Sequence, residues 1–116
     1  MKKKFFVITK TPLRVSFFGG GTDFKDFYKK HEGRVVATTI NKYIYVTVKN
    51  HEPLFNEKFR INYSDTERVN QINDIKNNII RECLKLTKIK PPIYISVVSD
   101  IPAHTGLGSS SSLSVG

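Results

Sequence analysis

The chain has 116 residues, a length that suits one domain with a modest hydrophobic core. Its 19 Lys and Arg residues exceed its 10 Asp and Glu residues and give a net charge of +9, which favours anionic ligands without choosing among them. The only cysteine, Cys83, excludes an internal disulfide, and the short apolar run before Thr9 cannot serve as a signal peptide or membrane span, so we expect a cytoplasmic protein.

The first predicted element is a β-strand that a glycine run interrupts. Residues 5–10 are mostly apolar, and after Pro12 the chain alternates with a period of two, which puts Arg14 on the face opposite to Leu13. Gly19, Gly20 and Gly21 should end this strand.

A short helix should follow the glycines. Phe24, Phe27 and Tyr28 have helical spacing, Thr22 or Asp23 can cap the helix, and Gly33 should close it.

The central part of the chain predicts further strands. Residues 35–40 and 43–49 are typical of two strands, and Asn41-Lys42 between them has the length of a hairpin turn, although it is a weaker turn signal than Asn-Gly. The stripe of Tyr43, Tyr45 and Thr47 is more typical of packing than of a base-stacking platform. Residues 59–63 alternate as in a strand with one solvated face.

A second helix and a last strand complete the predicted scaffold. The helix should begin after Asn73-Asp74, end before Pro91-Pro92 and pack the Cys83 thiol within an apolar stripe, which comprises Ile72, Ile75, Ile79, Ile80, Cys83 and Leu84. We expect residues 93–100 to form a strand inside a mainly antiparallel sheet. The three histidines, His31, His51 and His104, lie too far apart in sequence to suggest a local zinc site. We expect His104 to be a solvent-exposed loop residue, and contact with a nucleotide is the alternative.

The last seventeen residues, from Asp100 to Gly116, combine the exit of this strand with a Gly/Ser-rich turn. Gly106 and Gly108 allow backbone N–H groups to converge, Ser109 to Ser112 add hydroxyls, and a helix should open at Ser109 or Ser110, an arrangement suited to phosphate. The spacing excludes a Walker A loop and a dinucleotide fingerprint. A plain Gly/Ser linker is the alternative.

Two motifs of the chain resemble motifs of the GHMP kinases and occur in the same order along the sequence. Residues 102–112, Pro-Ala-His-Thr-Gly-Leu-Gly-Ser-Ser-Ser-Ser, resemble the ATP-phosphate motif of that superfamily, and residues 11–23, Thr-Pro-Leu-Arg-Val-Ser-Phe-Phe-Gly-Gly-Gly-Thr-Asp, resemble its substrate motif. The Gly-Gly-Gly-Thr-Asp form of the second motif, and also residues 39–46, resemble the sequences of kinases that act on the anomeric hydroxyl of heptose 7-phosphate. The resemblance implies an α+β fold with the left-handed β-α-β domain that these kinases share with a small-subunit ribosomal protein. It also implies that residues 1–116 form an incomplete N-terminal ATP-binding domain, with its C-terminal part expected beyond Gly116.

The resemblance assigns roles by position. It implies ATP and Mg²⁺, with Ser110 as the metal contact and with ATP contacts from Pro102, Gly106, Leu107, Gly108, Ser109, Ser110 and Ser111. Arg14 would be catalytic, and the sugar would contact Gly20, Gly21, Thr22 and Asp23. Arg14 as a strand-surface charge and Asp23 as a helix cap are the alternatives.

The implied function is ATP-dependent phosphorylation of heptose 7-phosphate. Gly20 and Gly21 replace a glutamate and a histidine of galactokinases, which leaves room for another or larger sugar, and a fucose kinase or a basic RNA-binding module of the same fold are the alternatives. We expect sugar phosphate and ATP as partners in preference to nucleic acid or membrane. The family's catalytic aspartate and acidic metal ligand are expected beyond Gly116, so residues 1–116 alone should be inactive. Neither the oligomeric state nor the exact acceptor follows from the sequence.

Overall fold

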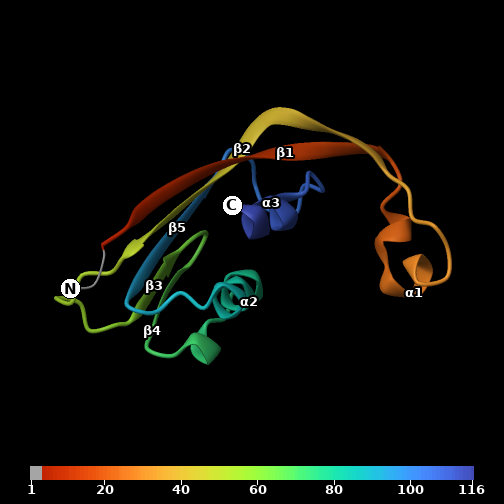
Figure 1. Ribbon diagram of the computed structural model, residues 1–116. Coiled ribbons are helices and arrows are strands. Elements are labelled where there is room, and N and C mark those ends of the chain that lie inside the picture. The colour runs from red at the N-terminus through yellow and green to blue at the C-terminus, as the bar shows by residue number, and fades with distance from the viewer. Residues whose placement is uncertain (1–3) are drawn as a thin grey trace.

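A computed structural model describes residues 4–116 as a five-stranded sheet with two helices, α2 and α3, on one face (Figure 1). The strand order is β1-β2-β5-β3-β4. In chain order the elements are β1 (Phe6–Phe18), η1 (Gly21–Asp23), α1 (Lys25–Tyr28), β2 (Val36–Asn50), β3 (Phe59–Asn62), β4 (Thr66–Val69), η2 (Ile72–Asp74), α2 (Asn78–Thr87), β5 (Ile93–Ser99) and α3 (Ser109–Val115).

Strand pairing confirms the expected α+β fold. β1 pairs with β2, β2 with β5 and β3 with β4, all antiparallel, whereas β3 and β5 are parallel neighbours. A parallel pair needs a long crossover, and the segment through β4 and α2 supplies it. The predicted last strand is therefore central in a mainly antiparallel sheet, and it delivers the chain directly to the Gly/Ser-rich loop.

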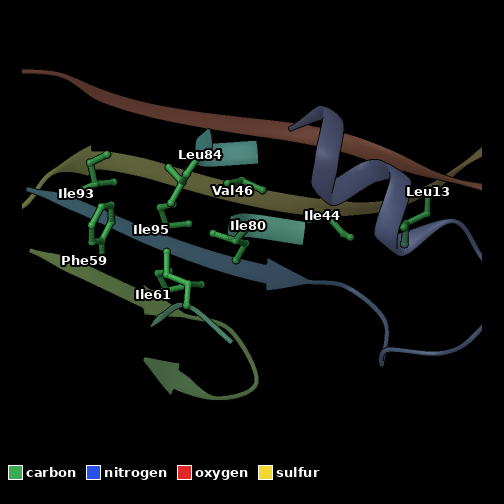
Figure 2. Packing of buried hydrophobic residues seen from close by; sticks show 10 residues of the cluster. Leu13, Ile44, Val46, Phe59, Ile61, Ile80, Leu84, Ile93 and Ile95 are labelled. Carbon is green, nitrogen blue, oxygen red and sulfur yellow. The ribbon is translucent and has the colours of Figure 1, made fainter. Parts of the chain in front are cut away.

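The core lies between the sheet and the helices (Figure 2). Alternation in β2 buries Ile44 and Val46 and leaves Tyr43 and Tyr45 half-buried on the other face, as the period of two predicts. Nζ of Lys10 lies over the Tyr43 ring, 4.2 Å from its centroid, so a side chain of the neighbouring strand β1 packs against the aromatic stripe of Tyr43 and Tyr45. The buried hydrophobic cluster comprises Leu13, Ile44, Val46, Phe59, Ile61, Ile75, Ile80, Leu84, Ile93 and Ile95.

The predicted hairpin at Asn41-Lys42 is wrong, because β2 runs through these residues without a turn. The pairing of β1 with β2 shifts there: Pro12 faces Tyr43 and the next paired residue, Arg14, faces Thr39. Leu13 thus lies opposite a bulge formed by residues 40–42 and is completely buried. Asn-Lys lacks the glycine that favours a tight turn, and β1 offers a full-length partner, so a bulge forms in place of a hairpin.

The predicted cap of the first helix is also wrong. Thr22 and Asp23 belong to the 3-10 turn η1, and α1 begins after Phe24 without any side-chain cap. The Thr22 hydroxyl instead bonds the backbone of Arg34, accepting from its N–H at 3.2 Å and donating to its carbonyl at 3.1 Å. The glycine break itself is confirmed: Gly19 has φ 98°, and a Cβ there would lie 2.4 Å from the Arg34 carbonyl oxygen.

The second helix is confirmed but starts later than its apolar stripe suggests. Asn73 and Asp74 lie in η2, and the N-cap of α2 is Asn77, whose Oδ1 accepts from the Ile80 N–H at 3.1 Å. Cys83 is half-buried beside Leu84, as expected of a packed thiol. Strand β4 was not predicted, because its buried position holds a charged residue, Glu67, and so lacks an apolar period. No helix within residues 4–116 has the length and apolarity needed to cross a membrane.

Candidate active site

The Gly/Ser-rich loop between β5 and α3 has the backbone conformation that its glycines predict. Gly106 and Gly108 have φ angles of 74° and 78°, and Gly108 is the N-cap of α3, which begins at Ser109 as expected. A Cβ on Gly106 would meet no atom within 4 Å, whereas a Cβ on Gly108 would lie 3.1 Å from Cγ of Arg14. Gly108 is therefore needed for close approach of Arg14, and Gly106 leaves open space beside the loop.

Arg14 connects β1 to this loop through both its backbone and its side chain. Its N–H donates to the Leu107 carbonyl at 2.9 Å, and its Nη1 donates to the Gly106 carbonyl at 2.9 Å. The buried Ser112 hydroxyl donates to the Pro12 carbonyl, also at 2.9 Å, and so attaches α3 to the same strand. Arg14 is thus not an isolated charge on a strand surface.

A cleft of about 740 Å³ opens beside the loop. Gly106, Gly108, Ser109 and Ser110 line one side, together with Arg14, His104 and Ala103. The remaining lining residues are Ile44, Tyr63, Ser64, Asn77, Ile79, Val97, Ser99 and Leu113. Among the described residues, Arg14 is the only Lys or Arg in this lining, and no carboxylate lines it, so the cleft favours an anion.

Four of the seven predicted ATP contacts line the cleft and three do not. Gly106, Gly108, Ser109 and Ser110 line the cleft, whereas Leu107 is half-buried against the hydrophobic core. The remaining two, Pro102 and Ser111, are exposed and are not part of the cleft lining. His104 is exposed as expected, yet it lines the cleft with a left-handed φ of 64°.

Sequence reasoning missed the wall that Tyr63, Ser64 and Asn77 contribute. Tyr63 and Ser64 follow β3, and Asn77 precedes α2. One signal was available: Asn77 stands directly before the helical residues Asn78, Ile79 and Ile80, which is the position of an N-cap. Nothing in the sequence places Tyr63 beside it.

The four predicted sugar contacts lie elsewhere. Thr22 and Asp23 line a separate hollow of about 390 Å³, together with Tyr28, Gly33, Arg34 and Val35. The neighbouring glycines, Gly20 and Gly21, precede and begin η1. Figure 1 shows α1, which follows η1, at the far end of the long β1–β2 ribbon, away from α3. The described residues therefore bring Arg14 to the Gly/Ser-rich loop but leave Asp23 in a different hollow.

Metal ligands are sparse in the described part of the chain. Residues 4–116 contain no group of three His, Cys, Asp or Glu side chains placed to hold a metal ion. The predicted metal contact, Ser110, offers one hydroxyl at the cleft. His51 is buried and stacked on Phe55, with Nε2 3.3 Å from Oε1 of Glu57, which is a structural arrangement.

Comparison with known proteins agrees with this geometry. Residues 73–116, which contain the loop and α3, match the family model described as GHMP kinases N terminal domain. A D-glycero-alpha-D-manno-heptose 7-phosphate kinase of Campylobacter jejuni is 32% identical over 120 residues, which cover 93% of this chain and 34% of that protein. Residues 73–116 therefore carry part of a GHMP kinase N-terminal domain, and the whole chain is similar to the N-terminal third of a GHMP-type sugar kinase.

Other GHMP kinase comparisons extend the likeness. A galactokinase of Thermotoga maritima is 27% identical over 110 residues, which cover 91% of this chain and 30% of that protein. The crystal structure of a D-glycero-D-manno-heptose 1-phosphate kinase from Bacteroides thetaiotaomicron superposes with a TM-score of 0.72 at 23% identity over 96% of this chain and 39% of that one, so it shows the same fold. The chain spans about a third of the length of these curated relatives.

Proposed function

We propose that this GHMP kinase domain holds the phosphates of ATP for a sugar kinase that phosphorylates the anomeric hydroxyl of heptose 7-phosphate. The observation that carries the proposal is the attachment of Arg14 to the loop at Gly106 and Leu107, beside a cleft that no carboxylate of the described residues lines. The heptose 7-phosphate kinase of Campylobacter jejuni supports this acceptor class.

The residues of the cleft fit a polyphosphate. Phosphoryl transfer depends mainly on positioning and on neutralising charge, and ATP supplies the transferred group. Backbone N–H groups near Gly106 and Gly108 and the hydroxyls of Ser109 and Ser110 would donate to phosphate oxygens. A guanidinium has five N–H donors, so Arg14 can keep its bond to Gly106 and still bind an anion.

The fit to Mg²⁺ is partial. Ser110 would contribute a hydroxyl to a metal ion bridging the phosphates, but Mg²⁺ sites in proteins also use carboxylates, and no carboxylate of residues 4–116 lines the cleft. In our proposal the chain's own share is to hold the phosphates, and we expect the 116-residue chain alone to release no ADP in response to sugar.

The acceptor would contact Thr22 and Asp23. Because phosphoryl transfer needs the acceptor hydroxyl next to the phosphates, the proposal requires their hollow, which is separate from the cleft in this structure, to lie against the Gly/Ser-rich loop during the reaction. The exposed Asp23 carboxylate can accept hydrogen bonds from sugar hydroxyls, and it would repel a nearby substrate phosphate. Arg34 lines the same hollow and offers a cation to such a phosphate, although its Nη2 also pairs with Glu32 at 3.0 Å. Gly20 has open space where a Cβ would stand, which leaves room for a larger sugar.

A chimera tests the proposal. Residues 1–116 would replace the corresponding third of the Campylobacter jejuni kinase, and ADP release would be measured with heptose 7-phosphate, galactose and fucose. We expect the highest kcat/KM with heptose 7-phosphate. The Asp23→Asn chimera should lose kcat/KM for the sugar by about tenfold or more while the ATP Kd changes little, because only a sugar-side hydrogen bond is weakened.

Two results would contradict the proposal. A folded, ATP-binding chimera that prefers galactose or fucose would assign the domain to another sugar kinase. An unchanged sugar kcat/KM in the Asp23→Asn chimera would remove Asp23 from the acceptor site. An Asp26→Asn chimera is the matched control, because Asp26 is exposed on α1 and is not part of that hollow.

A further inference from the structure

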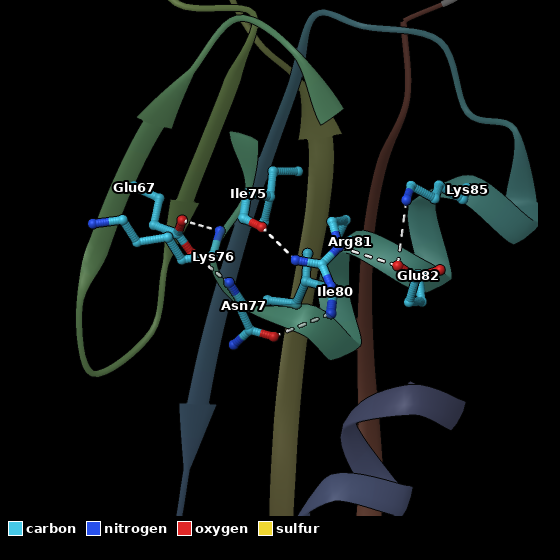
Figure 3. Close-up of polar contacts among 8 residues, drawn as sticks. All are labelled: Glu67, Ile75, Lys76, Asn77, Ile80, Arg81, Glu82 and Lys85. Atoms are coloured by element: carbon cyan, nitrogen blue, oxygen red, sulfur yellow. Dashed lines mark hydrogen bonds and ion pairs between the residues drawn. The ribbon is translucent and has the colours of Figure 1, made fainter. Parts of the chain in front are cut away.

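Glu67 is a buried carboxylate that the proposed chemistry does not use. It lies in β4 and is 7% exposed, and its carboxylate lies next to Lys76 and Asn77, just before α2 (Figure 3). Oε1 accepts from the Lys76 N–H at 2.6 Å, and Oε2 accepts from the Asn77 N–H at 3.0 Å. Oε2 also accepts from the Tyr63 hydroxyl at 2.8 Å. One carboxylate therefore joins three segments that are separate in the sequence: the end of β3, strand β4 and the turn before α2.

Two of the partners of Glu67 face the cleft. Tyr63 and Asn77 both line it, and Asn77 also caps α2 through Ile80. The turn before α2 has a second brace, since Nη1 of Arg81 donates to the Ile75 carbonyl at 2.9 Å (Figure 3). The cleft wall thus contains the Tyr63 phenol, the Asn77 side-chain amide and the apolar side chain of Ile79. This combination of hydrogen-bonding and apolar surface is typical of small-molecule sites.

The charge state of the network agrees with its geometry. Burial by itself would raise the pKa of the Glu67 carboxyl, but hydrogen bonds from Lys76, Tyr63 and Asn77, together with the Lys76 charge, hold it below its ordinary value of 4.5. Burial raises the pKa of Tyr63 to about 12, reinforced by its hydrogen bond to Glu67 and by the negative charges of Glu67 and Asp65. An ionised Glu67 thus accepts from a neutral Tyr63 across the physiological range.

We propose that Glu67 is a positioning residue that holds Tyr63 and Asn77 in the cleft wall against the nucleoside part of the bound nucleotide. This inference rests on the proposed function, because it requires a nucleotide in the cleft. Glu67 itself touches no ligand. It holds the Tyr63 hydroxyl and the Asn77 backbone N–H, so its loss should weaken recognition of the nucleoside and leave the phosphate side intact.

The test compares ADP with inorganic tripolyphosphate, which lacks a nucleoside, by isothermal titration calorimetry on the 116-residue chain. Glu67→Gln should bind ADP about tenfold more weakly, since three bonds to a charged acceptor are disturbed, while the tripolyphosphate Kd stays within about twofold of wild type. Glu52→Gln is the matched control, because the Glu52 side chain is 45% exposed, pairs with Lys4 and is not part of the cleft lining. It should leave both Kd values unchanged.

A second variant covers the case in which Glu67→Gln does not fold. Tyr63→Phe keeps the carboxylate bonded to both backbone N–H groups, so it should fold and weaken ADP about threefold with tripolyphosphate unchanged. The inference is overturned if folded Glu67→Gln binds ADP as wild type does, if it loses both ligands equally, or, where it fails to fold, if Tyr63→Phe binds ADP normally. Wild-type protein that binds neither ligand would overturn the proposed function as well, so the two failures are distinguishable.

Discussion

Nη1 of Arg14 donates a hydrogen bond of 2.9 Å to the carbonyl oxygen of Gly106, joining residues that are 92 positions apart in the sequence. The bond forms because the β1–β2 bulge lies next to Arg14 and because Gly108 has no side chain to block the arginine stem. Arg14 therefore stabilises the conformation of the loop and also places a positive charge beside it.

Arg14→Lys should keep a positive charge but lose the planar fork that reaches Gly106. We expect the ATP Kd of the chain to rise about tenfold or more, because a charge-assisted contact and the loop shape are both affected. Calorimetric titration with ATP measures this effect. Arg68→Lys, at an exposed position of β4, is the control and should bind ATP as wild type does. Equal affinities for Arg14→Lys and wild type would separate Arg14 from the phosphate site.

The two loop glycines should differ in their response to alanine. Both have φ near 75°, so each substitution strains the backbone by about 1–2 kcal/mol. Gly108→Ala should cost more than Gly106→Ala, because its Cβ would also press on Arg14 at 3.1 Å while the space beside Gly106 is open. Denaturant unfolding compares the two free energies. A Gly106→Ala variant less stable than Gly108→Ala would contradict the close approach of Arg14.

The serine run should divide by function. Ser112→Ala removes a buried hydroxyl bonded to Pro12 and should lower the free energy of unfolding by about 1–2 kcal/mol. Ser110→Ala should leave stability unchanged and weaken ATP binding, since Ser110 lines the cleft and is exposed. Ser111→Ala, exposed and outside the cleft lining, should change neither quantity. Unfolding curves and ATP titrations of the three variants measure the two effects. If the loop does not bind ATP, Ser110→Ala will bind ATP as wild type does.

Much of this arrangement could be predicted from the sequence. Alternation predicted which side chains of β2 and β3 face the core, and the Gly/Ser-rich loop predicted glycine backbone angles at Gly106 and Gly108 and a helix opening at Ser109 or Ser110, which begins at Ser109. The bulge in β2 could not be predicted, because it depends on pairing with a strand about thirty residues earlier in the chain. The cleft wall at Tyr63 and Asn77 could not be predicted for a similar reason. The residue that joins them, Glu67, is a charged side chain in the interior, where sequence patterns lead one to expect an apolar residue.

The stabilising role of Glu67 should depend on pH. Its folded-state pKa lies below the ordinary 4.5, so its contribution is complete above pH 4.5 and is lost as pH falls through the lower, folded-state value. The difference in unfolding free energy between wild type and Glu67→Gln should be constant near neutral pH and should shrink progressively below pH 4.5. Unfolding curves over this pH range measure the difference. If the difference in unfolding free energy grows on acidification, Glu67 is not held ionised by its three hydrogen-bond donors.

The most direct test of the phosphate-binding account is a titration of the ¹⁵N-labelled chain with ATP, followed by amide chemical shifts in two-dimensional NMR spectra. The account predicts that the largest saturable shifts fall on the amides of Gly106, Gly108, Ser109 and Ser110, with the Arg14 side-chain signals moving in parallel. Salt should weaken but not abolish them. Shifts confined to lysines of the opposite sheet face such as Lys10 and Lys49, with the loop amides unmoved, would contradict it.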